Sequence, residues 1–145
     1  MKILIPVDGS VSALAAVRHA LRLRHDGLQA SFVLATVQEP TYLYEMVLAP
    51  NADVLERVTG AVGARSLKDA QALFNEAGVL FEQEIGSGSV SETLIEIAGR
   101  YSCEAIIMGA RGWGALRSAL LGSVSHAVLQ ASVVPVTIVK QVVLV

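Results

Sequence analysis

Four of the twelve glycines of this chain lie close together near its C-terminal end, at Gly109, Gly112, Gly114 and Gly122. The pattern Gly109-x2-Gly112-x9-Gly122-Ser123 follows a short apolar run and precedes a segment with helical spacing. Glycine allows the backbone to approach a ligand closely, and the amides and dipole of a helix N-terminus favour an anion. The spacing therefore predicts a phosphate-binding loop. A loop whose glycines only make tight turns, with Ser123 only capping the helix, explains the same spacing.

A second group of candidate residues, Pro6-Val7-Asp8-Gly9-Ser10, follows the first apolar run of the chain. In open parallel sheets, ligands bind outside the carboxyl ends of the strands, where the strand order reverses. If the first and fourth strands are neighbours there, Asp8 faces the glycine loop. An ionised carboxylate only accepts hydrogen bonds, so Asp8 suits the hydroxyls of a ribose better than a phosphate. The alternative is that Asp8 is a turn or cap residue at the start of the first helix.

Other catalytic and metal-binding patterns are weaker or absent from the sequence. There is no G-x-x-x-x-G-K-[ST] motif of the P-loop enzymes and no G-x-S-x-G motif of the α/β-hydrolases. The segment Gly86-Ser87-Gly88-Ser89-Val90-Ser91 is a near miss of a dinucleotide fingerprint, with Ser91 where the third glycine belongs. The three histidines lack ligand spacing, and the single Cys103 makes neither an internal disulfide nor a zinc site. We expect Cys103 to be a small buried residue.

Short apolar runs alternate with longer segments of helical spacing. The runs are rich in Val, Ile, Leu and Phe, which is typical of strands in a sheet covered on both faces. We expect strands at 3–7, 31–37, 79–84, 105–108 and 135–140, and helices at 11–25, at about 51–77, from the capping-box sequence Ser89-Val90-Ser91-Glu92 and from Gly122-Ser123. Ser10 or Ser12 can cap the first helix, and Gly60 and Gly63 weaken the second, so a kink or break there would be no surprise. The alternation predicts an open parallel α/β sheet in one domain spanning 1–145.

The segment from Glu39 to Asp53 is the longest stretch that these patterns do not place. It contains Tyr42, Tyr44 and Met46. A plain surface loop is the simpler interpretation, and a lid or a dimer contact are the alternatives.

The composition limits the classes of function. The 145 residues are 53% hydrophobic with a mean hydropathy of +0.56, yet no apolar stretch approaches the roughly 18 residues of a membrane span. The first residues reach Pro6 and Asp8 too early to hold the apolar region of a signal peptide. With 11 basic against 13 acidic residues, the chain lacks the excess of positive charge that nucleic-acid binding requires. We therefore expect a cytoplasmic protein that binds neither membranes nor nucleic acids.

The two groups of residues together resemble the universal stress protein family in its nucleotide-binding branch. The resemblance rests on Pro6-x-Asp8-x-Ser10 and on Gly109-x2-Gly112-x9-Gly122-Ser123, and it extends over the chain to the run Pro135 to Val139. It implies a Rossmann-like, five-stranded parallel sheet in the order 3-2-1-4-5 with helices on both faces. It also implies bound ATP or AMP, which Mg²⁺ could accompany, and a homodimer formed through the last strand.

The resemblance also implies a role for each residue that matches the family pattern. Asp8 would contact the ribose, the backbone of Val37 would contact the adenine, and Pro6 and Val7 would line the base pocket. The residues expected to hold the phosphates are Gly109, Arg111, Gly112, Gly122, Ser123 and Val124.

The sequence departs from the family pattern at three places. Glu104 stands where an aspartate is usual, Gly88-Ser89-Val90 lacks the common proline, and Gln141 to Val145 extends past the usual end. The apolar residues Val142 to Val145 add a strand edge that would seek a partner, and we expect them to be buried in a dimer interface.

The implied function is a nucleotide-binding regulatory module of the stress response that acts as a dimer. Two alternatives stay open. One is a slow ATPase or nucleotidyl-transfer enzyme in the same cleft, for which only Arg111, Ser123 and Mg²⁺ are at hand and no general base is evident. The other is an interaction scaffold that binds no nucleotide.

Overall fold

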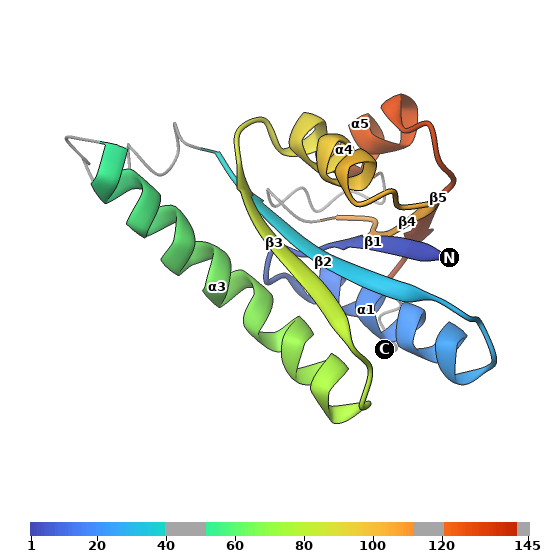
Figure 1. Cartoon of the computed structure of the whole chain (residues 1–145). Coiled ribbons are helices and arrows are strands. Elements are labelled where there is room, and N and C mark those ends of the chain that lie inside the picture. Colours follow the sequence, from blue (N-terminus) through green and yellow to red (C-terminus); the bar gives the residue numbers. More distant parts are fainter. Residues whose placement is uncertain (40–51, 112–120, 142–145) are drawn as a thin grey trace.

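Five parallel strands form one sheet in the order β3-β2-β1-β4-β5, which confirms the predicted topology. The computed structural model describes residues 1–39, 52–111 and 121–141. Its elements, in chain order, are β1 (Lys2–Pro6), α1 (Val11–His25), β2 (Ser31–Gln38), α3 (Ala52–Glu76), β3 (Phe81–Ser87), α4 (Val90–Arg100), β4 (Ala105–Gly109), α5 (Ser123–Ala131) and β5 (Val136–Val139). Helices α1 and α3 lie on one face of the sheet, and α4 and α5 lie on the other (Figure 1).

The alternation of side chains along the strands produces two cores, one on each face of the sheet. Ile3 and Ile5 of β1 pack with Phe32, Leu67 and Phe74 on the side of α1 and α3. On the side of α4 and α5, the core consists of Leu4, Val33, Leu94, Ile97, Met108, Val128 and their neighbours. The inner strands have no face toward water, and this accounts for the high apolar fraction of the chain.

Helix α1 begins and ends where the sequence predicts. Of the two candidate caps, Ser10 takes the position, because its hydroxyl oxygen accepts a hydrogen bond of 3.2 Å from the amide of Ala13. The helix ends at His25, and Gly27 follows with a φ of 116°, in the left-handed region where glycine is favoured.

The capping-box sequence correctly predicts where α4 begins, but the side-chain hydrogen bond that such a box implies is not formed. Ser89 is the N-cap residue, but its hydroxyl makes no capping hydrogen bond. The helix is held instead by its buried face, which includes Val90, Leu94 and Ile97. Packing therefore outweighs the local cap here.

The break considered in the second helix does not occur, because α3 runs without interruption from Ala52 to Glu76. Gly63 lies directly against Ile85 of β3, where a methyl group on the glycine would overlap the isoleucine side chain. Gly60 has open space around it. The glycine at 63 thus permits close packing of a helix on the sheet, and does not mark a kink.

The observed bounds of the strands differ most from the predicted ones at β3 and β5, the two edges of the sheet. The predicted strand 79–84 is observed as Phe81–Ser87, and its middle is the polar run Glu82-Gln83-Glu84. A strand at the edge needs less apolar surface than an inner one, so the apolar pattern places it poorly. At the other edge, β5 covers Val136–Val139, whereas 135–140 was predicted. Residues 40–51, with most of the unplaced segment, and the tail Val142 to Val145 lie outside the described residues.

Among the helices that the structure describes, none combines the length and apolar character that crossing a membrane requires.

Candidate functional site

The strand order reverses between β1 and β4, which are neighbours in the sheet. They pair in parallel, with Ile3 beside Ala105 and Leu4 beside Ile106. The segments that follow them, one starting with Val7 and Asp8 and the other with Ala110 and Arg111, therefore leave the sheet at the same edge. Open α/β sheets bind ligands at this place. The prediction that Asp8 faces the glycine loop required the first and fourth strands to be neighbours, and they are.

Asp8 has a structural role that the geometry displays directly. Its Oδ1 accepts a hydrogen bond of 2.9 Å from the amide of Ser10. Gly9, between the two, has a φ of 83°, so the turn uses a backbone conformation that glycine adopts readily. The carboxylate is half-buried and fixes the start of α1 at the carboxyl edge of the sheet. The turn role considered for Asp8 is therefore real, and a contact with a ribose would come in addition to it.

The end of β4 is packed tightly between two helices. The hydroxyl of Ser125 in α5 donates a hydrogen bond of 2.8 Å to the carbonyl oxygen of Gly109. On the other side, a methyl group on Gly109 would lie 2.6 Å from the carbonyl oxygen of Ser12 in α1. Two residues further along the chain, the amide of Arg111 donates to the hydroxyl of Ser12 in α1 at 3.1 Å. Only glycine fits at position 109.

The first amides of α5 have no hydrogen-bond acceptor within residues 1–39, 52–111 and 121–141. Its N-cap residue is Gly122, which has no side chain to accept from the first turn, and the Gly122 amide itself donates to the Ala110 carbonyl oxygen at 2.8 Å. No residue in the described part of the chain accepts a hydrogen bond from the amides of Ser123 or Val124. The amides and the helix dipole together favour an anion at this position.

The residues expected around the base lie along the ends of β1 and β2. Pro6 pairs with Ala35, and the amide of Val7 donates to the Ala35 carbonyl oxygen at 2.8 Å. Val37 pairs with Gly86 of β3. The side chains of Val7 and Val37 are buried in the two cores, at 1% and 0% exposure, so these residues can offer a ligand their backbone only.

The structure thus brings most of the predicted site residues to one edge. Asp8, Gly109, Arg111, Gly122, Ser123 and Val124 surround the ends of β1 and β4, and Pro6, Val7 and Val37 continue along β1 and β2. Gly112 lies outside the described residues, as does Gly114.

Two residues of this edge were not predicted as part of the site, Ser12 and Ser125. Both are buried, at 8% and 3% exposure. The available signal was a serine on the buried face of a helix, since Ser12 lies one turn before Ala16 and Ser125 one turn before Val128. A buried hydroxyl needs a hydrogen-bond partner, and here the partners are backbone groups at the end of β4.

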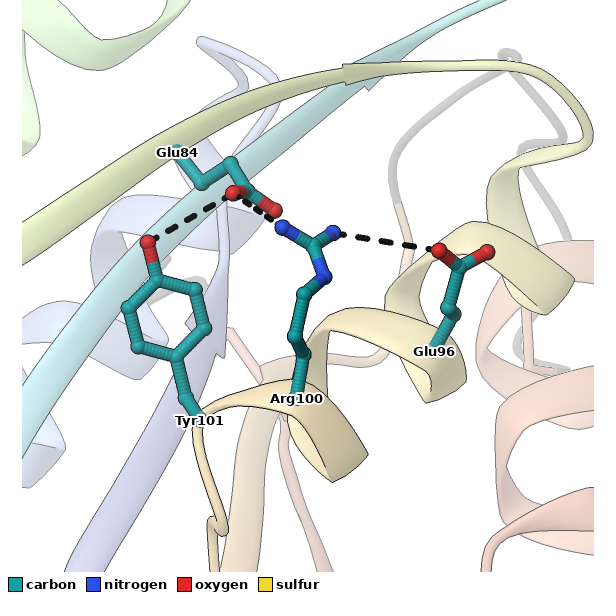
Figure 2. Close-up of polar contacts among 4 residues, drawn as sticks. All are labelled: Glu84, Glu96, Arg100 and Tyr101. Atoms are coloured by element: carbon teal, nitrogen blue, oxygen red, sulfur yellow. Dashed lines mark hydrogen bonds and ion pairs between the residues drawn. The ribbon is translucent and has the colours of Figure 1, made fainter.

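A cluster of polar side chains lies between the edge strand β3 and the C-terminal part of α4. Figure 2 shows Arg100 between Glu84 of β3, at 2.6 Å, and Glu96, at 3.9 Å, with the Tyr101 hydroxyl 3.5 Å from Glu84. Burial raises the pKa of Tyr101, and the hydrogen bond to Glu84 raises the pKa of Arg100. The Arg100–Glu84 pair joins α4 to the edge strand, whereas the Arg100–Glu96 pair lies within α4. Partly exposed ion pairs of this type contribute little to stability.

Two further features lie away from the carboxyl edge. Cys103, just before β4, is buried as predicted, and burial raises the pKa of its thiol. It lines a cavity of about 280 Å³ with Ile95, Ile106 and Val133, between α4 and the link from α5 to β5. Within the described ranges, no three His, Cys, Asp or Glu side chains come together as a metal site.

The comparison with known proteins agrees with this geometry. The model of the Universal stress protein family matches residues 1–140. Universal stress protein MJ0531 of Methanocaldococcus jannaschii is 27% identical, over 97% of this chain and 82% of its own length. The solved structure of the protein MJ0577 is 25% identical, with a TM-score of 0.81 over 97% of this chain and 96% of that one. A universal stress protein solved in complex with cAMP is 26% identical, with a TM-score of 0.68 over 96% of both chains. The family model covers nearly all of the sequence, and the chain belongs to the universal stress protein family.

Proposed function

We propose that this chain binds an adenine nucleotide, ATP or AMP, at the carboxyl edge of β1 and β4 and acts in the stress response as a nucleotide-dependent dimer. The observation that carries the proposal is the N-terminus of α5. Its first amides have no acceptor among the described residues, and its cap is a glycine, which has no side chain to accept from them. The related protein solved with cAMP supports the class of ligand.

Each part of the nucleotide has a place along this edge. The phosphates would lie against Gly109, Arg111, Gly112, Gly122, Ser123 and Val124, where the exposed cationic side chain of Arg111 would join the amides. The ribose hydroxyls would donate to Asp8, and the base would lie over Pro6 and Val7 and meet the backbone of Val37. Mg²⁺ would accompany the phosphates of ATP.

The proposed working unit is a dimer of a single 145-residue domain in the cytoplasm, assembled through β5. Support for the assembly comes from the position of β5 at an edge of the sheet and from the exposed Val133 just before it, at 96%. An edge strand has peptide groups without partners in its own sheet, and a second copy can supply them.

Calorimetry of the purified protein with ATP, AMP and adenosine tests the nucleotide site, and Ser123→Asp makes the test specific. An aspartate in the first turn of a helix favours folding through the helix dipole but repels a phosphate. We expect the variant to unfold at or above the wild-type temperature and to bind ATP at least about tenfold more weakly, which is the effect of roughly 1.4 kcal/mol. Adenosine should bind it nearly unchanged.

Gln130→Asp is the matched control, because it adds the same charge at an exposed position of the same helix, one residue before its end. We expect this variant to bind ATP like the wild type. A wild-type protein that gives no heat with either nucleotide at high micromolar concentration, and from which no adenine nucleotide is released on denaturation, would refute the proposed function.

A further inference from the structure

Four backbone polar groups at the corner formed by Gly109, Ala110 and Arg111, where the chain leaves β4, are held by different partners. The Gly109 carbonyl oxygen accepts from Ser125, and the Ala110 amide donates to the Val139 carbonyl oxygen at 3.0 Å. The Ala110 carbonyl oxygen accepts from Gly122 at 2.8 Å, and the Arg111 amide donates to Ser12. Two of these four partners are side chains, and both are buried serine hydroxyls.

Ser12 connects this corner to the other half of the site. Asp8 fixes the amide of Ser10, the Ser10 hydroxyl caps α1, and Ser12 in the first turn of that helix holds the amide of Arg111. The close contact of Gly109 with the Ser12 backbone leaves little freedom between the two segments. A short series of contacts therefore runs from the residue proposed for the ribose to the loop proposed for the phosphates.

Ser125 acts from the opposite side. It belongs to the first turn of α5, whose amides form the proposed phosphate site, and its hydroxyl ties that turn to the last residue of β4. Both residues are buried, at 8% and 3% exposure, and the hydroxyl of each is already bonded to a backbone group, so we do not place them in contact with a ligand. Their hydrogen bonds can affect binding only by holding the corner in place.

We propose that Ser12 and Ser125 are positioning residues that keep the phosphate-binding amides aligned with the Asp8 half of the site. The inference rests on the proposed nucleotide function and adds to it two residues that touch no ligand. Preorganised donors bind tightly because no ordering is needed when the ligand arrives. Removing one hydroxyl should therefore weaken ligands that carry phosphates and leave the binding of adenosine almost unchanged.

The test compares Ser12→Ala and Ser125→Ala with the wild type in calorimetric titrations with ATP and with adenosine. One lost hydrogen bond should weaken ATP binding by about fivefold in each variant, with less than about twofold change for adenosine. Ser132→Ala is the matched control. The Ser132 hydroxyl also bonds to the backbone, at Val134, but at the far end of α5. It should bind both ligands like the wild type.

Amide hydrogen exchange of the ligand-free protein provides a second measurement that does not depend on nucleotide. We expect exchange at Arg111 to become several-fold faster in Ser12→Ala and to stay unchanged in Ser132→Ala. Thermal unfolding checks that all variants are folded at the temperature of the titrations.

The outcomes separate this inference from the function on which it rests. Weaker ATP binding with intact adenosine binding, together with faster exchange at Arg111, supports it. Equal losses for ATP and adenosine, or no loss for either, would overturn it even though the wild type binds nucleotide. A wild type that binds neither ligand would refute the proposed function, while unchanged exchange at Arg111 would by itself refute the positioning role of Ser12.

Discussion

Gly109 shows how one residue type decides whether the proposed site can form. At this position the backbone of β4 touches the backbone of the first turn of α1, with Ser12 as the contact. Without that contact, Arg111 could not reach the Ser12 hydroxyl. The glycine that the family pattern marks for phosphate binding is thus required by the packing of β4 on α1. Its role in phosphate binding stays a proposal.

We predict that Gly109→Ala destabilises the protein by about 1–3 kcal/mol, the usual effect of forcing extra volume into a tightly packed place. The new methyl group would lie 2.5 Å from the Ser12 hydroxyl oxygen and 2.6 Å from its carbonyl oxygen, and the backbone oxygen cannot move aside without shifting α1. Urea unfolding followed by circular dichroism measures the effect.

Gly99→Ala is the control for this prediction, because a methyl group there meets nothing within 4 Å and the residue lies in α4. Alanine is the better helix former, so this variant should be neutral or more stable by up to about 1 kcal/mol. Equal effects at positions 99 and 109 would show that the close approach of β4 and α1 is not a constraint.

At the scale of elements, the helices and inner strands could be predicted because their signals are local. The cap at Ser10 and the apolar runs of β1 and β2 are visible within a few neighbouring residues. Ser123 was considered as the cap of α5, but the N-cap residue is Gly122 and Ser123 is the first residue of the helix. The role of Ser12 could not be predicted in this way. Its partner Arg111 is 99 positions away, and only the sheet brings them together. The sequence could place Asp8 at the carboxyl edge of the sheet. It could not decide between a turn contact and a ligand contact, because the same carboxylate can make both.

The two glycines of α3 show the same limit. Helix propensity treats Gly60 and Gly63 alike, since each lacks the side chain that stabilises a helix. The fold separates them, because Gly63 faces Ile85 of β3 and Gly60 faces open space. A pattern within the helix does not reveal which glycine lies at the closest approach to the sheet.

We predict opposite effects for alanine at these two positions. Gly60→Ala should stabilise the protein by about 0.5–1 kcal/mol through helix propensity alone. Gly63→Ala gains the same propensity but displaces the Ile85 side chain, and we expect a net loss of about 1 kcal/mol or more. Chemical denaturation of the two variants side by side measures the difference, and equal stabilisation by both would show that α3 does not pack on β3 at Gly63.

At the scale of the whole molecule, the order β3-β2-β1-β4-β5 explains the location of the proposed site and makes β3 and β5 the two edge strands of the described sheet. In open α/β sheets the place where the strand order reverses, here between β1 and β4, is where ligands bind. The edges differ in character. The middle of β3 consists of polar and charged residues. In β5, Val136 and Ile138 are half-buried apolar residues that pack on the core beneath α4 and α5. If the protein is a dimer, β5 is the edge suited to form it.

The hydrogen bonds of β5 indicate how this interface can be tested. The carbonyl oxygens of Pro135 and Val139 accept from the amides of Ile106 in β4 and of Ala110 just after it. The peptide groups of the alternate residues Val136 and Ile138 are therefore directed toward the other side of β5, at the edge of the sheet. Proline at position 138 removes a donor at that edge and spares the bonds to β4. We predict that Ile138→Pro is a monomer and that Ile138→Ala, which loses the same apolar side chain but keeps the amide, remains a dimer. Light scattering coupled to size-exclusion chromatography distinguishes these states. A monomeric wild type, or a dimeric Ile138→Pro, would mean that β5 does not pair with a second copy of the chain.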